Sequence, residues 1–175
     1  MRRLMLLRHA KSAWPGGSAD IDRPLATRGR DAAPLVARHM ADEGLAPDLV
    51  LVSPARRTQE TWNLVRGSAA DAQVRTDSRI YEAPPGRLLE VVQEVVPEVR
   101  TLLMIGHNPG FEGLARILVG HGDRYAFARL SQKYPTAGLA VIDFPVESWR
   151  EVEPRTGRLD RFVTPKTLGA DADDD

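Results

Sequence analysis

An arginine and a histidine stand together directly after the first apolar run of the chain. Leu4 to Leu7 form that run, and Arg8 and His9 follow it at once. The run predicts a buried strand, and strands that feed helices in an α/β sheet open at their carboxyl ends toward the ligand crevice. Histidine can act as a nucleophile or carry a proton, and arginine presents a planar fork to phosphate or carboxylate. The pair therefore predicts a nucleophile beside an anion clamp, although one such pair also fits an exposed strand end.

A second polar segment follows the apolar run 49–52. Its sequence predicts a helix with Ser53 as N-cap and Pro54 at the first helical position. The unpaired N–H groups of a helix N-terminus attract anions, and Arg56 and Arg57 add positive charge there. Because basic residues in a first turn oppose the helix dipole, an anion site and a solvated basic turn are both open interpretations.

The third signal is His107, which follows the apolar run 102–105. Asn108 and Pro109 come next and are expected to start a helix, while Gly106 and Gly110 indicate tight backbone geometry beside the histidine. A histidine at this point can face a ligand or simply cap the turn.

Strand and helix patterns alternate along the chain, which predicts a three-layer α/β/α fold with a mostly parallel central sheet. Predicted strands cover 3–7, 49–52, 102–105 and 139–144, with a weaker strand and loop over 74–80 and a last edge strand over 158–163. Predicted helices cover 28–43 with Thr27 as N-cap, 53 to about 65, 88–96, and 108 to about 120. We expect one domain over residues 1–168 and a disordered acidic tail over 169–175.

Composition excludes several classes of function. Lys and Arg together number 24 and so do Asp and Glu, so there is no overall basic field to attract nucleic acid or an anionic membrane. Cysteine is absent, which excludes disulfides, thiol catalysis and Cys-bound metal centres. The apolar N-terminal run is too short for a signal peptide or a membrane span, so we expect a cytoplasmic protein.

Taken together, the three signals resemble the histidine phosphatase superfamily, with its phosphoglycerate mutase-like fold, and most of all its small phosphohistidine phosphatases of the SixA type. The resemblance covers about residues 4–143. Four motifs in the right order carry it: Leu7-Arg8-His9-Ala10-Lys11-Ser12 with Trp14, Asp22-Arg23-Pro24-Leu25 with Thr27 and Gly29, Ser53-Pro54 with Arg57 and Thr61, and Gly106-His107-Asn108-Pro109-Gly110. One departure is Ala10, where the superfamily motif has glycine.

The resemblance implies a role for each matching residue. His9 is the nucleophile that takes the phosphoryl group, and Arg8, Arg57 and His107 hold the oxygens of that group. The family spacing, with a threonine four residues after the arginine, selects Arg57 over Arg56.

The chemistry fits these roles. Phosphoryl transfer depends on positioning and charge stabilisation, which two arginines and a protonated His107 would supply, so no metal or other cofactor is expected. His9 must attack as neutral imidazole, which requires a hydrogen-bond partner on its other ring nitrogen, and a backbone carbonyl would suit. Glu82 falls where many members keep a proton-donating acid, although it can equally be an ordinary exposed glutamate.

Other polar residues carry two interpretations each. Ser12 can contact phosphate or cap its loop, Trp14 can line the pocket mouth or pack, and Arg23 can belong to the motif or make a surface salt bridge. We expect His39 to be a packing residue on a helix and His121 to lie in a loop.

The leading hypothesis is a phosphatase acting on a phosphohistidine-bearing protein in signal transduction. The first alternative is a phosphatase of the same superfamily acting on a small phosphorylated molecule; a mutase would need inserted loops for which the chain is too short. The second is a phosphate- or phosphopeptide-binding module that has lost catalysis. A metal-dependent hydrolase built on His9 and His107 lacks any short-spaced ligand motif.

Overall fold

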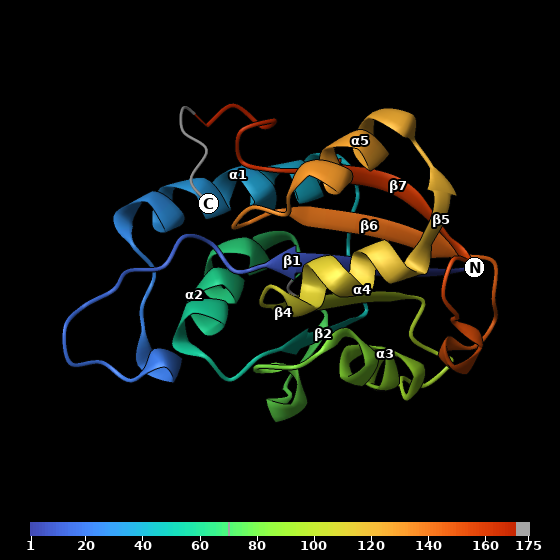
Figure 1. Ribbon diagram of the computed structural model, residues 1–175, viewed down its shortest axis with the longest axis horizontal. Coiled ribbons are helices and arrows are strands. Elements are labelled where there is room, and N and C mark those ends of the chain that lie inside the picture. Colours follow the sequence, from blue (N-terminus) through green and yellow to red (C-terminus); the bar gives the residue numbers. More distant parts are fainter. Residues whose placement is uncertain (70, 171–175) are drawn as a thin grey trace.

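A seven-stranded sheet runs through the middle of the protein (Figure 1). The computed structural model describes residues 1–69 and 71–170, so positions 171–175 of the expected acidic tail lie outside the described residues. In spatial order the strands are β3 (Gln73–Thr76), β2 (Leu49–Val52), β4 (Thr101–Gly106), β1 (Arg2–Arg8), β6 (Leu139–Phe144), β7 (Gly157–Val163) and β5 (Val119–Gly122).

Most neighbouring strands are parallel. The pairs β3–β2, β2–β4, β4–β1 and β7–β5 are parallel, whereas β6 is antiparallel to both β1 and β7. The mostly parallel sheet predicted from the sequence is therefore confirmed. Because β2, β4 and β1 are parallel neighbours, their carboxyl ends lie side by side at one end of the sheet.

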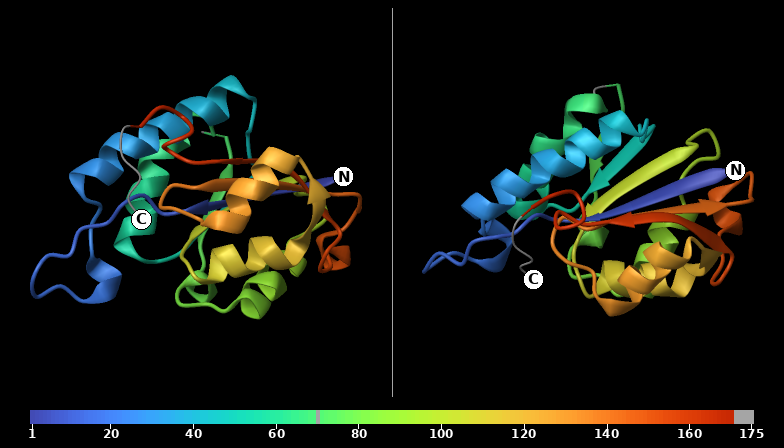
Figure 2. Two further views of the ribbon diagram at one scale, coloured as in Figure 1. Left: turned by 45° about the horizontal axis from the view of Figure 1, so that its top comes forward. Right: turned by 90° about the horizontal axis from the view of Figure 1, so that it is seen from above.

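Helices cover both faces of the sheet, as the edge-on view of Figure 2 shows. Leu4 and Leu6 of β1 point into one core and Met5 and Leu7 into the other, and all four are fully buried. Burial on both faces explains why the central strands are continuous apolar runs without alternation. One core contains α1 (Thr27–Asp42) and α2 (Arg56–Val65), and the other contains α3 (Pro85–Gln93), α4 (Gly110–Leu118) and α5 (Arg124–Gln132).

Two predicted helix starts are wrong by two or three residues, for the same kind of reason. The Ser53 hydroxyl accepts a hydrogen bond from the Ala55 N–H in a local turn, so α2 begins at Arg56 with Ala55 as its N-cap. Asn108 precedes a cis peptide bond to Pro109, and α4 begins at Gly110. In both places, polar side chains at a strand end hold a turn before the helix begins.

Other boundaries also differ from the prediction. The helix predicted over 88–96 starts earlier, at Pro85, and the helix predicted from 28 starts at Thr27, with Ala26 as its N-cap. The segment 119–132, without a long apolar run, contains β5 and α5, which the sequence did not predict. His121 therefore lies in a strand, and β7 is not an edge strand because β5 pairs with its outer side. No helix in residues 1–69 and 71–170 has the length and apolar character needed to span a membrane.

The segment after β1 forms a long loop that projects from the end of the sheet (Figure 1). Backbone hydrogen bonds close its base, from Ala13 N–H to Pro24 O (2.8 Å) and from Ala26 N–H to Lys11 O (2.9 Å). Gly29, at the start of α1, packs on this base. A Cβ atom there would lie 2.2 Å from the Lys11 carbonyl oxygen, so only glycine allows the helix to approach the loop that carries His9.

We predict that Gly29→Ala destabilises the protein and lowers its activity. The added methyl group must displace the Lys11 backbone, and overpacking of this kind costs about 1–3 kcal/mol. Urea denaturation and turnover would measure both effects. Gly16→Ala is the matched control, because a Cβ atom there meets nothing within 4 Å. Equal stability of the two variants would contradict the close contact between α1 and the loop.

Candidate functional site

Three strand ends bring the predicted site residues together. The His9 N–H donates to Gly106 O at the end of β4 (3.0 Å), and the Ser53 N–H donates to Ile105 O (3.1 Å). His9, Ser53 and His107 therefore follow three adjacent strands, although they are far apart in the sequence. The convergence expected from the sequence is the direct consequence of the strand order β2-β4-β1.

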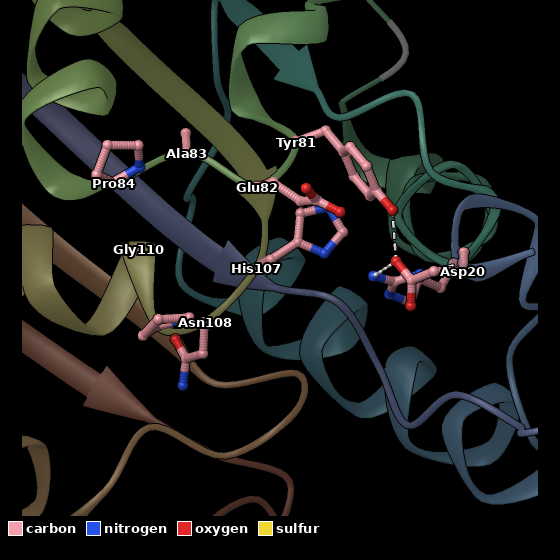
Figure 3. A pocket seen from close by; sticks show the side chains of 10 residues that line it. Asp20, Tyr81, Glu82, Ala83, Pro84, His107, Asn108 and Gly110 are labelled. Atoms are coloured by element: carbon pink, nitrogen blue, oxygen red, sulfur yellow. Dashed lines mark hydrogen bonds and ion pairs between the residues drawn. The ribbon is translucent and has the colours of Figure 1, made fainter.

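A cavity of about 490 Å³ opens at this end of the sheet (Figure 3). Of the predicted site residues, Arg57, His107 and Glu82 form part of its wall, and His9 adjoins it through His107, with the two ring centroids 5.3 Å apart. The wall consists of Asp20, Arg57, Tyr81, Glu82, Ala83, Pro84, His107, Asn108, Pro109 and Gly110.

His9 is held in one tautomer by its neighbour in the chain. Its Nδ1 lies 2.7 Å from the carbonyl oxygen of Ala10, and because a carbonyl can only accept, Nδ1 carries the proton and Nε2 keeps its lone pair. Burial, above all, lowers the pKa of His9 well below the usual value, and the nearby His107, Arg8 and Arg57 act in the same direction. The ring is thus neutral at neutral pH with a lone pair on Nε2, and the carbonyl partner expected from the sequence is present.

Thr61 connects the backbone just after His9 to α2, the helix that carries Arg57. Its hydroxyl accepts a hydrogen bond from the Ala10 N–H (3.0 Å) and donates one to the Arg57 carbonyl oxygen (2.7 Å). Thr61 is completely buried. The arginine–threonine spacing that singled out Arg57 therefore has a structural reason, since this threonine ties α2 to the peptide after His9.

Arg57 is buried, and both Nη atoms of its guanidinium contact Asp20. Nη1 donates to the Asp20 carbonyl oxygen (2.8 Å) and Nη2 to the Asp20 carboxylate (3.1 Å). Its Nε is buried without a hydrogen-bond partner among the described residues. A buried N–H of this kind is costly unless a ligand accepts from it. Arg8 donates from Nη1 to the carbonyl oxygen of Tyr134 (3.0 Å), which fixes its side chain.

His107 has one occupied and one unoccupied ring nitrogen. Nε2 lies 2.8 Å from the Ser53 hydroxyl, and Nδ1 is buried with no hydrogen-bond partner in the part of the chain that the structure describes. When Ser53 donates to Nε2, the neutral ring carries its proton on Nδ1. That N–H and Arg57 Nε are two buried donor positions on residues of the cavity wall, and both suit an anion.

The expected protonated state of His107 does not hold for this structure. Burial lowers the pKa of His107 to about 4, and Arg57 and Arg8 also favour the neutral form, whereas Asp20 opposes them. His107 is therefore neutral at pH 7. A phosphoryl group bound beside it would add negative charge and favour its protonation.

Two predicted residues have other surroundings. Glu82 is exposed at the cavity wall, with a backbone φ of 54°, so it can reach a bound leaving group. Ser12 is buried, and its hydroxyl accepts a hydrogen bond from Arg23 Nη2 (2.6 Å). This bond gives Ser12 a role within the loop, and a phosphate contact by Ser12 stays a prediction.

Residues with two open interpretations are also placed. Arg23 is buried rather than on the surface, and its guanidinium lies 3.3 Å from the ring centroid of Trp14, whose other surface is exposed. Arg56 is exposed and pairs with Glu60, as expected for a residue outside the anion clamp. His39 is half-buried on α1 beside Arg161.

Asp20 and Tyr81 are wall residues that the sequence did not single out. The Tyr81 hydroxyl donates to the Asp20 carboxylate, and Figure 3 shows this bond beside His107. Asp20 lies just before the matched segment that starts at Asp22, and nothing in the local sequence separates the roles of these two carboxylates. Only the tertiary contact with Arg57 distinguishes them.

Comparison with known proteins agrees with this arrangement. Residues 4–101 match the family model of the histidine phosphatase superfamily (branch 1). An uncharacterized protein of Mycobacterium tuberculosis is 39% identical over 162 residues, which cover 91% of this chain and all of the relative.

Solved structures show the same fold. The crystal structure of a putative phosphohistidine phosphatase SixA from Agrobacterium tumefaciens superposes with a TM-score of 0.80 at 31% identity, covering 94% of this chain and 98% of that one. A mycobacterial glucosyl-3-phosphoglycerate phosphatase has a TM-score of 0.66 at 20% identity, covering 91% of this chain and 98% of the other. At that identity the second match shows the fold alone.

The lowered pKa of His107 predicts a specific loss of stability in acid. Between the unfolded pKa near 6.5 and the folded value of about 4, the unfolded chain binds the extra proton, so the free energy of unfolding falls as the pH decreases through this range. We expect His107→Gln to reduce the loss between pH 7 and pH 4 by about 2–3 kcal/mol, as measured by urea denaturation. His121→Gln, at an exposed position in β5, is the control, and an equal loss in wild type and His107→Gln would contradict the buried neutral ring.

Proposed function

This chain belongs to the histidine phosphatase superfamily, and on that premise we propose that it hydrolyses phosphohistidine on a protein substrate through a phospho-His9 intermediate. The observation that carries this proposal is the tautomer of His9. With Nδ1–H bound to the Ala10 carbonyl, the Nε2 lone pair is available without any further base. The likeness to the putative SixA structure supports phosphohistidine as the substrate class.

Phosphoryl transfer to His9 requires two bond changes at phosphorus. A bond forms between His9 Nε2 and phosphorus while the bond from phosphorus to the substrate nitrogen breaks, and His9 keeps its proton on Nδ1. The substrate imidazole, protonated on its second ring nitrogen, keeps the electron pair of the broken bond and departs as a neutral molecule. Arg57 Nε and His107 Nδ1, both without protein partners among the described residues, are placed to donate to the phosphoryl oxygens, and Arg8 adds positive charge. Such fixed donors in a buried site supply the charge stabilisation that this transfer needs.

Hydrolysis of phospho-His9 then regenerates the enzyme. Water attacks phosphorus, the P–Nε2 bond breaks, and His9 returns to the neutral form that burial favours. We propose that no metal ion takes part, because guanidinium and imidazole donors take the place of a cation. Activity should accordingly be unchanged by a chelator.

The surroundings of the cavity support a protruding side chain as substrate. Glu82 is exposed, and the side chain of Asp20 retains 46% of its accessible surface. A phosphohistidine on a protein surface can enter such an open mouth.

The decisive experiment compares wild type with His9→Ala on a phosphohistidine-bearing protein, followed by a rapid quench. We expect acid-labile phosphate on the wild-type enzyme together with phosphate release, and neither with His9→Ala. Equal release by both enzymes would overturn the mechanism. Binding of the phosphoprotein without turnover by the wild type would indicate a binding module instead.

A small phosphorylated molecule is the second candidate substrate. The cavity of about 490 Å³ is large enough for such a molecule. Steady-state assays with phosphomonoesters beside the phosphoprotein separate the two, because a preference for esters of at least tenfold in kcat/KM would assign the small-molecule activity.

Glu82→Gln tests how far the reaction needs a proton donor. An alkoxide leaving group needs a proton and typically depends on a general acid by about 10²–10⁴-fold, whereas an imidazole departs readily. We expect Glu82→Gln to lower phosphohistidine turnover less than about tenfold and ester turnover by about 100-fold or more, with the exposed Glu90→Gln on α3 as control. Complete loss of phosphohistidine turnover in Glu82→Gln would contradict this view of the leaving group.

A further inference from the structure

The carboxylate of Asp20 lies beside Arg57, an arginine predicted to bind the phosphoryl oxygens. Asp20, in the short 3-10 helix Asp20–Asp22, lines the cavity wall together with Arg57 and Glu82. These three are the charged residues of the wall, since burial and the nearby arginines keep His107 neutral. The wall therefore carries two carboxylates against one guanidinium, which is unexpected in a site that must attract a phosphoryl dianion.

Asp20 is held by donors from three separate segments. Its Oδ2 accepts from Tyr81 and from Arg57 Nη2 (3.1 Å), and its Oδ1 accepts from Arg23 Nη1 (3.1 Å). The hydrogen bond from Tyr81, above all, and the two arginines hold the pKa of Asp20 well below its usual range. Asp20 is thus a carboxylate at neutral pH and acts as a hydrogen-bond acceptor.

The contact with Asp20 occupies the Nη end of the Arg57 guanidinium and leaves Nε for another ligand. Each Nη atom donates one N–H to Asp20, and the N–H of Nε has no hydrogen-bond partner among the described residues. Phosphoryl oxygens are then bound by Nε, while the positive charge of the Nη end is offset by Asp20. A leaving group that projects into the cavity meets the carboxylates of Asp20 and Glu82 rather than a free cation.

This placement favours one kind of leaving group. Phosphohistidine whose second ring nitrogen is protonated carries an N–H that can donate to a carboxylate, and its imidazole departs as a neutral molecule once the P–N bond breaks. A leaving group with its own carboxylate, such as a glycerate, is repelled by the same charge. The side chain of Asp20 is 46% exposed, so solvent and salt partly screen its charge, and we expect a moderate selectivity rather than exclusion of anionic leaving groups.

We propose that Asp20 is a specificity-determining residue, which selects neutral or N–H-donating leaving groups over anionic ones. This inference rests on the proposed function, since it names the feature that favours a phosphohistidine substrate at the same site. The competing interpretation is that Asp20 only positions Arg57, in which case its loss would affect all substrates alike.

The test measures kcat/KM of wild type and Asp20→Asn on three probes: a neutral peptide with one phosphohistidine, glycerol 3-phosphate and 3-phosphoglycerate. The two esters differ by one carboxylate, so their ratio isolates the effect of leaving-group charge. We expect Asp20→Asn to shift both the ratio of phosphohistidine to 3-phosphoglycerate and the ratio of the two esters by about tenfold toward 3-phosphoglycerate. Asp20→Glu should keep the wild-type ratios, and Asp22→Asn, an exposed carboxylate in the same 3-10 helix, is the matched control.

Each outcome decides one point. Ratios unchanged in Asp20→Asn, with all rates lowered equally, would overturn the specificity role and leave a positioning role. Failure of the wild type to turn over the phosphohistidine peptide while it hydrolyses the esters would overturn the proposed function instead. If Asp20→Asn does not fold, the wild type still tests the inference. High salt screens the charge of Asp20, so it should reduce the selectivity of the wild type against 3-phosphoglycerate. A selectivity that does not change with salt would overturn the inference.

Discussion

The backbone of Ala10 is the point on which the site depends. Its carbonyl oxygen accepts from His9 Nδ1 and its N–H donates to Thr61, so one residue fixes both the tautomer of His9 and the position of this segment against α2. Both bonds are buried, where an unmade hydrogen bond costs more than in water. A backbone carbonyl also has an advantage over a carboxylate as partner, because it orients the ring without adding negative charge that would repel a phosphoryl group.

Burial then sets the chemistry of the two histidines. Water is largely excluded from both rings, and the nearby arginines make a further positive charge unfavourable, so His9 and His107 are neutral in this structure. In the mechanism that we propose, neutrality is the reactive state of His9. In the same mechanism, His107 gains its positive charge only when the phosphoryl group binds. The fixed positive charge comes from Arg8 and Arg57, whose orientations are held by a carbonyl oxygen and by Asp20.

The loop after β1 links His9 to Asp20. Arg23 lies buried within it and donates to Ser12, Ala13 and Asp20, while Gly29 allows α1 to support its base. The same loop thus carries His9 at its start and presents Asp20 to the cavity. On the proposed roles of these residues, changes within the loop would alter the leaving-group preference without moving the strands that precede His9, Ser53 and His107.

Much of this protein could be predicted from its sequence alone. The apolar runs of β1, β2 and β4 are buried on both faces, so they indicated central parallel strands, and the polar residues that follow them indicated one shared edge. The tautomer partner of His9 could also be expected, since the backbone offers a carbonyl close to the ring. The sequence prediction failed where the local signal is weak. The strand β5 has no apolar run, and turns at Ser53 and Asn108 precede α2 and α4, so these helices begin later than predicted.

The tertiary structure alone decided the protonation and the pairing of charges. Whether His107 is charged depends on how deeply its ring is buried and on the arginines around it, which no spacing in the chain encodes. Whether Asp20 or Asp22 meets Arg57 depends on how a long loop folds back across α2, because two neighbouring carboxylates have the same chemistry until one of them is brought within hydrogen-bond distance. Sequence determined which groups are present and which strand ends carry them, and the fold determined their distances and burial, on which electrostatic energies depend.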